Sequence, residues 1–256
     1  MKPVLFWLDS VPIYSYALFS ILGMLIGTLW AWNEFRRRNL PTHWLRLLVP
    51  RIALCAFLGA RILHVASHWH DYHSLHALIW RWRPGMSFHG AMLGSIVGVL
   101  WATRQFHLPL WTILDALAPA APLGHAIGRV GCFLNGCCYG KPTNVFWAVR
   151  FRNRALCPDN LPRHPTQLYE AFGLLLLFGF LVRCSPCRAG KRFWLWVGGY
   201  GVLRFITEFW RAGSNPIFLS LTAPQWLSIA LISSALWSIK FTNRNFAQPV
   251  KNEGGI

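Results

Sequence analysis

The sequence is short of charge, and above all of acidic charge. Of its 256 residues only 8 are Asp or Glu, and charged residues of both signs make up 13% of the chain. Soluble domains usually carry about a quarter charged residues. This shortage argues against a soluble globular protein and indicates a chain that lies in a lipid bilayer.

Three other features are missing, and each argues against a class of protein. No basic domain stands apart from the apolar segments, so the net charge of +17 favours anionic lipid headgroups over nucleic acid as partners. No small-residue cleavage pattern follows the first apolar run, which ends at Arg36, Arg37 and Arg38, so we expect a retained helix rather than a signal peptide. No internal repeat is present, which argues mildly against a transporter.

Apolar residues and tryptophan, in contrast, are abundant. Apolar residues make up 54% of the chain, the mean hydropathy is +0.36, and the 15 Trp suit a protein with two membrane interfaces. A helix that crosses a bilayer needs roughly 20 mostly apolar residues. We therefore predict an all-α polytopic membrane protein of about seven helices, over residues 14–32, 45–66, 88–103, 111–134, 166–183, 193–210 and 223–241.

The loops between these runs predict the organisation and orientation of the chain. No domain boundary is visible, so we expect one integral membrane domain over 1–242 and a polar cytoplasmic tail over 243–256. One side holds twelve basic residues and the other nine. Because basic loops favour the cytoplasm, the N-terminus is predicted outside, and the long loop between the fourth and fifth runs lies on the periplasmic side. Pro119 and Pro122 predict a kink in the fourth run.

Several charged residues fall inside or near the predicted spans, where each costs about 2.5 kcal/mol or more. They either lock the helices together as ion pairs or bind a ligand, and we favour the structural interpretation for Arg51 and Asp115. Arg204 and Glu208 are four residues apart, so they share a helical face. Glu208 can therefore hold the Arg204 guanidinium rigid for binding to phosphate. The set is Arg51, Arg61, Asp115, Arg129, Glu170, Arg204 and Glu208.

Two glycine-rich segments stand out. Gly90, Gly94 and Gly98 follow His89 at intervals of four residues, a spacing typical of close helix packing. The segment 128–140 combines four glycines with an Arg, an Asn and three Cys at the end of an apolar span. Backbone N–H groups in such a bend can bind an anion, and the alternative is a flexible helix exit.

Together these segments resemble the prolipoprotein diacylglyceryl transferase family, from Tyr14 to about Trp237. The most specific match is Gly128-Arg129-x-Gly131-x-Phe-x-Asn135-Gly136-x-x-Tyr-Gly140. The other matches are Gly85-Met-Ser-Phe-His89-Gly90, His164-Pro-Thr-Gln167-Leu-Tyr169-Glu170, Arg204-Phe-Ile-x-Glu208-Phe-x-Arg211 and an N-terminal Tyr16.

The resemblance implies a bacterial transferase of the cytoplasmic (inner) membrane with seven spans. Such an enzyme moves a diacylglyceryl group from phosphatidylglycerol to the lipobox cysteine thiol of a prolipoprotein signal peptide and releases glycerol phosphate. Its partners are therefore the lipid bilayer, phosphatidylglycerol and prolipoproteins, and no metal or organic cofactor is expected.

The resemblance also suggests roles for individual residues. His89 is the candidate base for the acceptor thiol, because imidazole titrates near neutral pH. Arg129 and Arg204 are expected to grip the lipid phosphate and stabilise the charge that grows on it. The expected substrate-binding residues are Tyr16, Arg61, Gly90, Asn135, Gly140 and Glu208.

The chain departs from the family at two positions, which leaves other functions open. Many members carry Asn in place of Cys132 and an acidic residue in place of Cys137. A paralogue that passes the lipid group to another acceptor is one alternative, and a transporter of anions or lipids is another. A redox sensor built on the cysteines is a third, for which Cys184-Ser-Pro-Cys187 is a candidate motif. The cysteine spacing matches no familiar zinc pattern.

Overall fold

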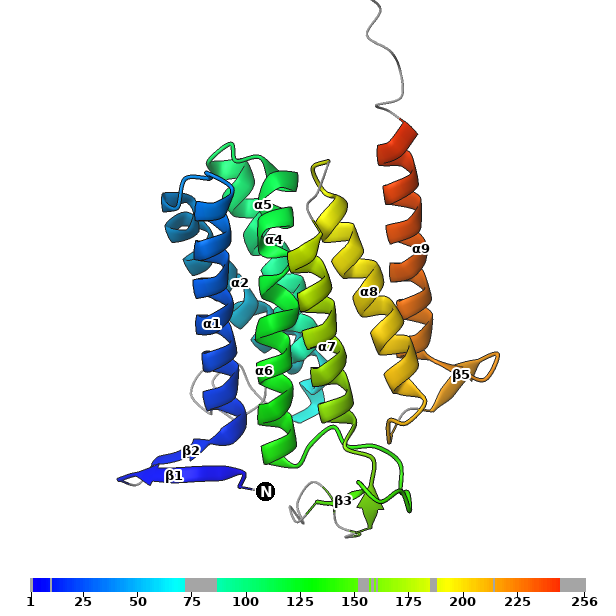
Figure 1. The fold of residues 1–256 in the computed structure, drawn as a ribbon. Coiled ribbons are helices and arrows are strands. Elements are labelled where there is room, and N and C mark those ends of the chain that lie inside the picture. Colours follow the sequence, from blue (N-terminus) through cyan, green and yellow to red (C-terminus); the bar gives the residue numbers. More distant parts are fainter. Residues whose placement is uncertain are drawn as a thin grey trace, which may run out of the picture. The chain divides into compact units, whose positions relative to one another are not determined.

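The computed structural model describes residues 2–9, 11–71, 87–151, 157, 159, 161–184, 188–213 and 215–244. Helices occupy all seven predicted runs (Figure 1). The fifth run was predicted with the observed bounds, and the others lie within a few residues of them. The helices are α1 (Ser15–Arg37), α2 (His43–Ser67), α4 (Phe88–Gln105), α5 (Leu110–Leu117), α6 (Ala120–Asn135), α7 (Thr166–Arg183), α8 (Lys191–Glu208) and α9 (Ala223–Arg244), with a short 3-10 turn at η1 (Trp69–Asp71).

The fourth run is broken where the sequence predicts a kink. The helix α5 ends at Leu117 and α6 begins at Ala120, with Ala118 and Pro119 in the turn between them. Proline has no backbone N–H and its ring clashes with the preceding turn, so it interrupts a helix. Pro122 is tolerated because it lies in the first turn of α6.

The chain is mostly helical, as predicted, and the sequence did not predict three short antiparallel pairs of strands, one before α1 and two between helices. Outside a helix, backbone groups still need partners, and pairing two extended segments supplies them. The strands are β1 (Val4–Leu8) with β2 (Val11–Tyr14), β3 (Val149–Arg150) with β4 (Pro162–Arg163), and β5 (Pro216–Phe218) with β6 (Leu221–Thr222).

Among the described helices, α1, α2 and α7 are long and apolar enough to cross a membrane. The full set of seven spans stays a prediction. The side chains of these helices expose many large apolar groups, such as Leu25, Ile62 and Phe172. Contact between such a surface and lipid has no free-energy cost, whereas contact with water does.

The chain packs as two compact units, which are described separately. The larger unit comprises Met1–Ala31 and Leu114–Ile256, and the smaller unit comprises Trp32–Ile113. The prediction of one domain over 1–242 stays a prediction, and the tail after residue 244 lies outside the described residues.

The smaller unit is built on the packing of α2 against α4. A Cβ added at Gly98 would lie 2.8 Å from the backbone oxygen of Arg51, and one at Gly90 or Gly94 would meet the carbonyl oxygen of Gly59 or Cys55. The glycines thus let the two backbones touch, which confirms the close-packing interpretation of their spacing.

Arg51 and Asp115 have the structural roles expected of them. The Arg51 guanidinium donates to the carbonyl oxygen of Leu47 and to the side chain of Gln105, which ties α2 to the end of α4. In the larger unit, the buried Asp115 carboxylate accepts hydrogen bonds from the N–H groups of Gly190 (2.7 Å) and Phe193 (2.8 Å). It therefore holds the first turn of α8, whose N–H groups have no partner within the helix.

In the larger unit the helices α6, α7, α8 and α9 follow one another side by side (Figure 1). The end of α6, the start of α7, the end of α8 and the start of α9 meet at the same end of this unit, next to the loop that carries β3. The polar residues described next lie on these four helices and the connections at that end.

Candidate active site

A buried ion pair joins α6 to α7. Arg129 Nη2 lies 2.7 Å from Glu170 Oε1, and the two side chains are only 11% and 2% exposed. Arg211 Nη1 approaches the other oxygen of Glu170 at 3.9 Å, and His125 Nε2 lies 3.7 Å from Oε1. Glu170 thus faces a guanidinium group and an imidazole from α6 and a second guanidinium group from the segment after α8.

A second buried pair lies within α8 and is joined by Thr222 of β6. Arg204 Nη1 lies 2.6 Å from Glu208 Oε2, four residues further along α8, as the sequence predicts. The hydroxyl of Thr222 donates to the other oxygen of Glu208 at 3.2 Å. The N–H of Thr222 in turn donates to Gln225 at 3.0 Å. Glu208 is 2% exposed, so these contacts fix its carboxylate and, through it, the direction of Arg204.

The two pairs form one electrostatic cluster. His125 and Tyr200, whose rings lie 5.6 Å apart, are each within electrostatic reach of Arg129, Arg204 and Glu170. Three guanidinium groups, those of Arg129, Arg204 and Arg211, face two carboxylates, so the cluster carries one positive charge in excess. The buried Arg129 Nε–H has no hydrogen-bond partner among the described residues. A buried donor without a partner costs free energy, so the cluster is suited to receive an anion.

Two further predicted residues lie on α6 or against it. Tyr16 stands in the first turn of α1, and its backbone lies against Gly131 of α6. Asn135 is the last residue of α6, and its side chain bonds to Cys137. Tyr16 is also within electrostatic reach of Cys137. The structure therefore places Tyr16 against α6, the helix that also carries Arg129 and Asn135.

Gly140 lies where three segments cross. Its N–H donates to the carbonyl oxygen of His164 at 2.9 Å, and its own carbonyl oxygen accepts from Arg163 at 3.1 Å. A Cβ at this position would lie 2.6 Å from both the Cβ of His164 and the carbonyl oxygen of Trp210. The structure gives Gly140 a packing role, and its expected contact with substrate stays a prediction.

Because the segments cross so closely at Gly140, one added methyl group there should lower the stability of the protein. We expect Gly140→Ala to lower the free energy of unfolding by about 1–3 kcal/mol, because neither backbone neighbour can yield easily. Gly128→Ala is the matched control, since a Cβ there meets nothing within 4 Å. Thermal unfolding of the detergent-solubilised variants measures both. Equal midpoints for the two variants would contradict the close crossing.

The remaining predicted residues belong to the smaller unit. Arg61 lies on α2, and Gly90 lies in the first turn of α4, where its N–H donates to Ser87 Oγ. His89 is in the same turn, but its side chain lies outside the described part of the structure. Their expected roles in the reaction stay predictions.

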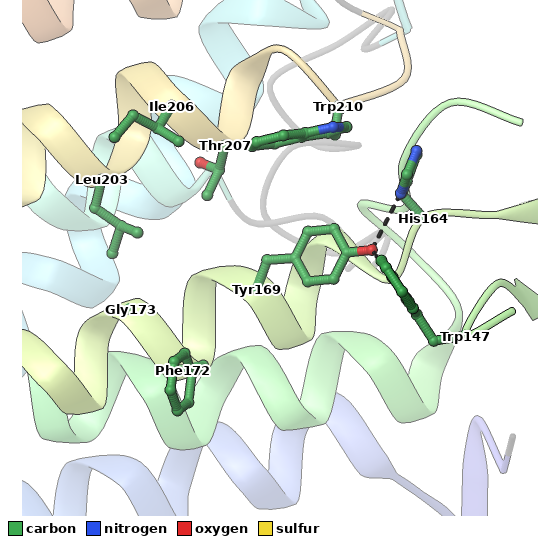
Figure 2. Close-up of a pocket in the computed structure, with 9 residues that line it drawn as sticks. All are labelled: Trp147, His164, Tyr169, Phe172, Gly173, Leu203, Ile206, Thr207 and Trp210. Atoms are coloured by element: carbon green, nitrogen blue, oxygen red, sulfur yellow. Dashed lines mark hydrogen bonds between the residues drawn. The ribbon is translucent and has the colours of Figure 1, made fainter. Parts of the chain in front are cut away.

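An apolar groove of about 400 Å³ opens between α7 and α8 (Figure 2). Phe172 and Gly173 line it from α7, and Leu203 and Ile206 line it from α8. At one end the hydroxyl of Tyr169 accepts a hydrogen bond from Trp147 Nε1 at 2.6 Å and lies 3.0 Å from His164 Nδ1. Other lining residues are Thr207 and Trp210.

The polar end of the groove is electrically neutral. Burial lowers the pKa of His164 below its ordinary value, so its imidazole is uncharged at neutral pH. The Trp147 N–H donates to the Tyr169 hydroxyl, which also shares a hydrogen bond with Nδ1 of the neutral imidazole. The groove thus offers an apolar channel with a hydrogen-bonded rim.

A further ion pair fixes the loop beside this rim. Arg163 pairs with Asp159, and its guanidinium lies 4.8 Å from the centre of the Tyr139 ring. The hydrogen bond from Arg163 holds the pKa of the Asp159 carboxyl below its usual value, so the pair is charged at neutral pH. This pair anchors the long loop to Gly140 and hence to the end of α6.

Comparison with known proteins places this arrangement in a family. The model of the family described as prolipoprotein diacylglyceryl transferase matches residues 3–241. The chain belongs to the prolipoprotein diacylglyceryl transferase family. Three relatives are named phosphatidylglycerol–prolipoprotein diacylglyceryl transferase. The one from Bordetella parapertussis is 35% identical over 95% of this chain and 96% of its own length. The one from Nitrosomonas europaea is 31% identical over 97% and 92%, and the one from Clostridium tetani is 31% identical over 91% and 94%.

In this member of the transferase family, the sequence patterns did not reveal every residue in and around the buried cluster. His125 was not singled out, although it lies four residues before Arg129 and so shares its helical face. Gln167 was noted only as part of a motif, yet it is buried and donates to the carbonyl oxygen of Cys137 at 2.6 Å. Glu170 was recognised as a charge in a span, but its partner Arg129 is 41 residues away. No local pattern reveals such a pairing.

Proposed function

We propose that this chain transfers the diacylglyceryl group of phosphatidylglycerol to the lipobox cysteine thiol of a prolipoprotein and releases glycerol phosphate. The observation that carries the proposal is the excess of guanidinium over carboxylate in the buried cluster of Arg129, Arg204, Arg211, Glu170 and Glu208. A fixed, buried and positive site is suited to a lipid phosphate, because no solvent has to reorganise when charge changes there.

The chemistry follows from where charge moves. The acceptor thiolate forms a C–S bond to the glycerol carbon of the lipid, and the C–O bond to the phosphate breaks. The electron pair of that bond stays on the leaving oxygen, so negative charge grows on the phosphate. Arg129 and Arg204 would bind this group, while Glu170 and Glu208 hold the two guanidinium groups in place.

The acceptor needs a base, since a free thiol has a pKa of about 8.5. We assign this role to His89, and substrate-binding roles to Arg61 and Gly90 on the same unit. Tyr16 and Asn135 would supply hydrogen bonds near the phosphate, and Gly140 would shape the backbone beside them.

The groove between α7 and α8 would receive an acyl chain of the lipid, because its lining is aliphatic and aromatic. We expect Ile206→Trp to fill it and to raise the KM for phosphatidylglycerol about tenfold, with little change in kcat, because the lost acyl-chain contact stabilises the ground state and the transition state equally. Leu236→Trp, on an exposed face of α9 away from the groove, is the control. Transfer assays at varied lipid concentration test this, and an unchanged KM would contradict it.

We further propose a multi-pass arrangement in the bacterial cytoplasmic membrane, with seven spans, the N-terminus outside and the C-terminus in the cytoplasm. The difference between twelve and nine basic residues on the two sides supports this orientation. The partners are the bilayer, phosphatidylglycerol and prolipoprotein signal peptides, with no role for nucleic acid.

The deciding experiment uses purified protein, phosphatidylglycerol and a synthetic lipobox peptide. We expect a mass-shifted peptide and released glycerol phosphate from the wild type and from Arg183→Ala, a control at the exposed end of α7. Both products should be lost in His89→Ala and Arg204→Ala. Near-normal transfer by His89→Ala would rule out its role as the base.

The same experiment separates the alternatives. Folded wild-type protein that yields no transfer would contradict the proposal, and the substitutions at Cys132 and Cys137 would then favour a paralogue with another acceptor. Flux of a labelled anion into proteoliposomes, without transfer, would favour a transporter.

A further inference from the structure

Three cysteine thiols meet at the end of α6 in the larger unit. The sulfur atoms of Cys132, Cys137 and Cys138 all lie within 4.8 Å of one another. None of the three is in a disulfide. Among the described residues, this is the one group of three or more His, Cys, Asp or Glu side chains with such convergent ligand atoms. The reaction proposed above uses none of these thiols.

The backbone at the end of the helix is what brings the thiols together. Gly136 closes α6 in the left-handed conformation, with φ of 80°, and the N–H of Cys137 folds back onto the carbonyl oxygen of Cys132 at 3.2 Å. Cys138 also has a positive φ, of 62°, which a residue with a Cβ rarely adopts. The strain of this conformation persists only where the surroundings impose it.

The start of α7 supplies those surroundings. The Thr166 hydroxyl donates to the carbonyl oxygen of Cys138 at 2.9 Å, and the Gln167 amide donates to that of Cys137 at 2.6 Å. Thr166 and Gln167 are both buried. The two cysteine backbones are therefore held in place by side chains that bond to their carbonyl oxygens and not to their sulfur atoms. The Cys137 thiol donates a weak hydrogen bond to the carbonyl oxygen of Cys132 at 3.7 Å, and metal binding would replace this S–H.

The distances fit a metal ion bound by sulfur. A tetrahedral zinc site has Zn–S bonds of about 2.3 Å, which places its sulfur atoms roughly 3.8 Å apart. The observed upper limit of 4.8 Å exceeds this by about one ångström, which small χ1 rotations can close. Cys132 is 7% exposed and the other two are half-buried, so the site is enclosed on one side and open on the other.

The local charge also suits such a site. Three thiolates around a divalent cation carry a net charge of minus one. Arg129 and Arg211 lie within electrostatic reach of Cys138, so the positive excess of the neighbouring cluster would balance this charge. The negative charge of a thiolate site in this place is therefore balanced by neighbouring positive charge.

We propose that Cys132, Cys137 and Cys138 form a binding site for a thiophilic divalent cation of the zinc class, with three thiolate ligands and one open coordination position. Binding replaces three S–H bonds by three metal–sulfur bonds, releases three protons to solvent and changes no oxidation state. Three protein ligands with one open position are the arrangement of a catalytic rather than a structural zinc site. On the proposed function, the open position would take the acceptor thiol as a thiolate, whose proton passes to the base assigned above.

The test of cation binding uses Co²⁺, whose complexes with thiolates absorb in the visible and near-ultraviolet range. Purified, reduced and metal-free protein in detergent is expected to bind one equivalent of Co²⁺, with sulfur-to-cobalt charge-transfer bands that Zn²⁺ abolishes by displacement. Cys132→Ser, Cys137→Ser and Cys138→Ser should each weaken binding by more than about 100-fold, because losing a ligand costs more than losing a group that only orients one.

Two controls locate the site. Cys55→Ser and Cys184→Ser remove thiols of α2 and of the Cys184-Ser-Pro-Cys187 sequence, and both should keep the cobalt spectrum of the wild type. Loss of the spectrum in Cys184→Ser would place the metal elsewhere and overturn the proposal. A folded wild type with three free cluster thiols but no cobalt band would overturn it too. The proposal would also be overturned if peptide mapping found a disulfide among Cys132, Cys137 and Cys138 that survives reduction.

The open position has its own test, which rests on the proposed function. A lipobox peptide with a free thiol should shift the visible bands of the Co²⁺ protein, and the same peptide with an S-methyl cysteine should not. Unchanged bands with both peptides would show that the fourth coordination position is closed, and would exclude binding of the acceptor thiol there. Because cobalt binding itself needs no transfer activity, failure of the metal site and failure of the transferase assay give different results.

Discussion

Diacylglyceryl transfer is expected to fall by about 10²–10³-fold when Arg129 is replaced by Gln. Arg129 is the guanidinium that joins α6 to α7, and its unpartnered Nε–H is buried beside the positive cluster. Loss of one fixed donor to developing negative charge typically costs this much in kcat. Because the charge on the phosphate grows as the C–O bond breaks, the loss should appear in kcat more than in the KM for phosphatidylglycerol.

Steady-state transfer to a lipobox peptide measures both constants. Arg183→Gln, at the exposed end of α7, controls for the loss of a positive charge without loss of the cluster. Arg129→Lys separates charge from shape, since an ammonium keeps the charge but cannot form the two-pronged contact of a guanidinium. Arg129→Gln with normal kcat and a folded structure would exclude Arg129 from the reaction.

The thermal stability of the protein is expected to fall sharply when Glu170 is replaced by Gln. Glu170 is buried and faces Arg129 and Arg211, so its neutralisation leaves buried positive charge uncompensated. Breaking a buried ion pair by removing one partner costs about 3–5 kcal/mol. We therefore expect a clear drop in the midpoint of thermal unfolding in detergent, which tryptophan fluorescence measures.

A double-mutant cycle distinguishes this pairing from a general loss of polarity. Arg129→Gln combined with Glu170→Gln should be more stable than Glu170→Gln alone, because the double variant leaves less uncompensated charge. Asp159→Asn is the matched surface control, and it should lower the midpoint much less, since an exposed ion pair contributes little. Strictly additive effects of the two substitutions would contradict a direct pairing of Arg129 with Glu170.

Local patterns in the sequence were sufficient for the helices. An apolar run can satisfy its backbone groups in a bilayer only by forming a helix, so hydropathy alone places α1, α2, α4 and α7–α9. The break before α6 follows from the chemistry of Pro119 in the same way. The Arg204–Glu208 pair was predictable as well, because two residues four apart share a helical face.

The short strand pairs were not predicted, because they depend on which connecting segments lie next to each other. Val149–Arg150 pairs with Pro162–Arg163 only after the loop has folded back on itself. Two-residue and three-residue strands carry no periodic signal that a sequence pattern could show. The apolar groove is hidden for the same reason, since its lining comes from α7, α8 and the loop residues Trp147 and His164.

By itself the sequence determined that the chain is helical, apolar and a member of one transferase family, because helix periodicity, hydropathy and motifs are written in neighbouring residues. Only the tertiary structure decided that Glu170 pairs with Arg129 and that Cys132, Cys137 and Cys138 converge. The first pairing depends on the packing of α6 against α7. The second depends on a left-handed turn at Gly136 and a positive φ at Cys138, held by the start of α7. Contacts of this kind arise when separate segments meet in space, and spacing along the chain does not encode them.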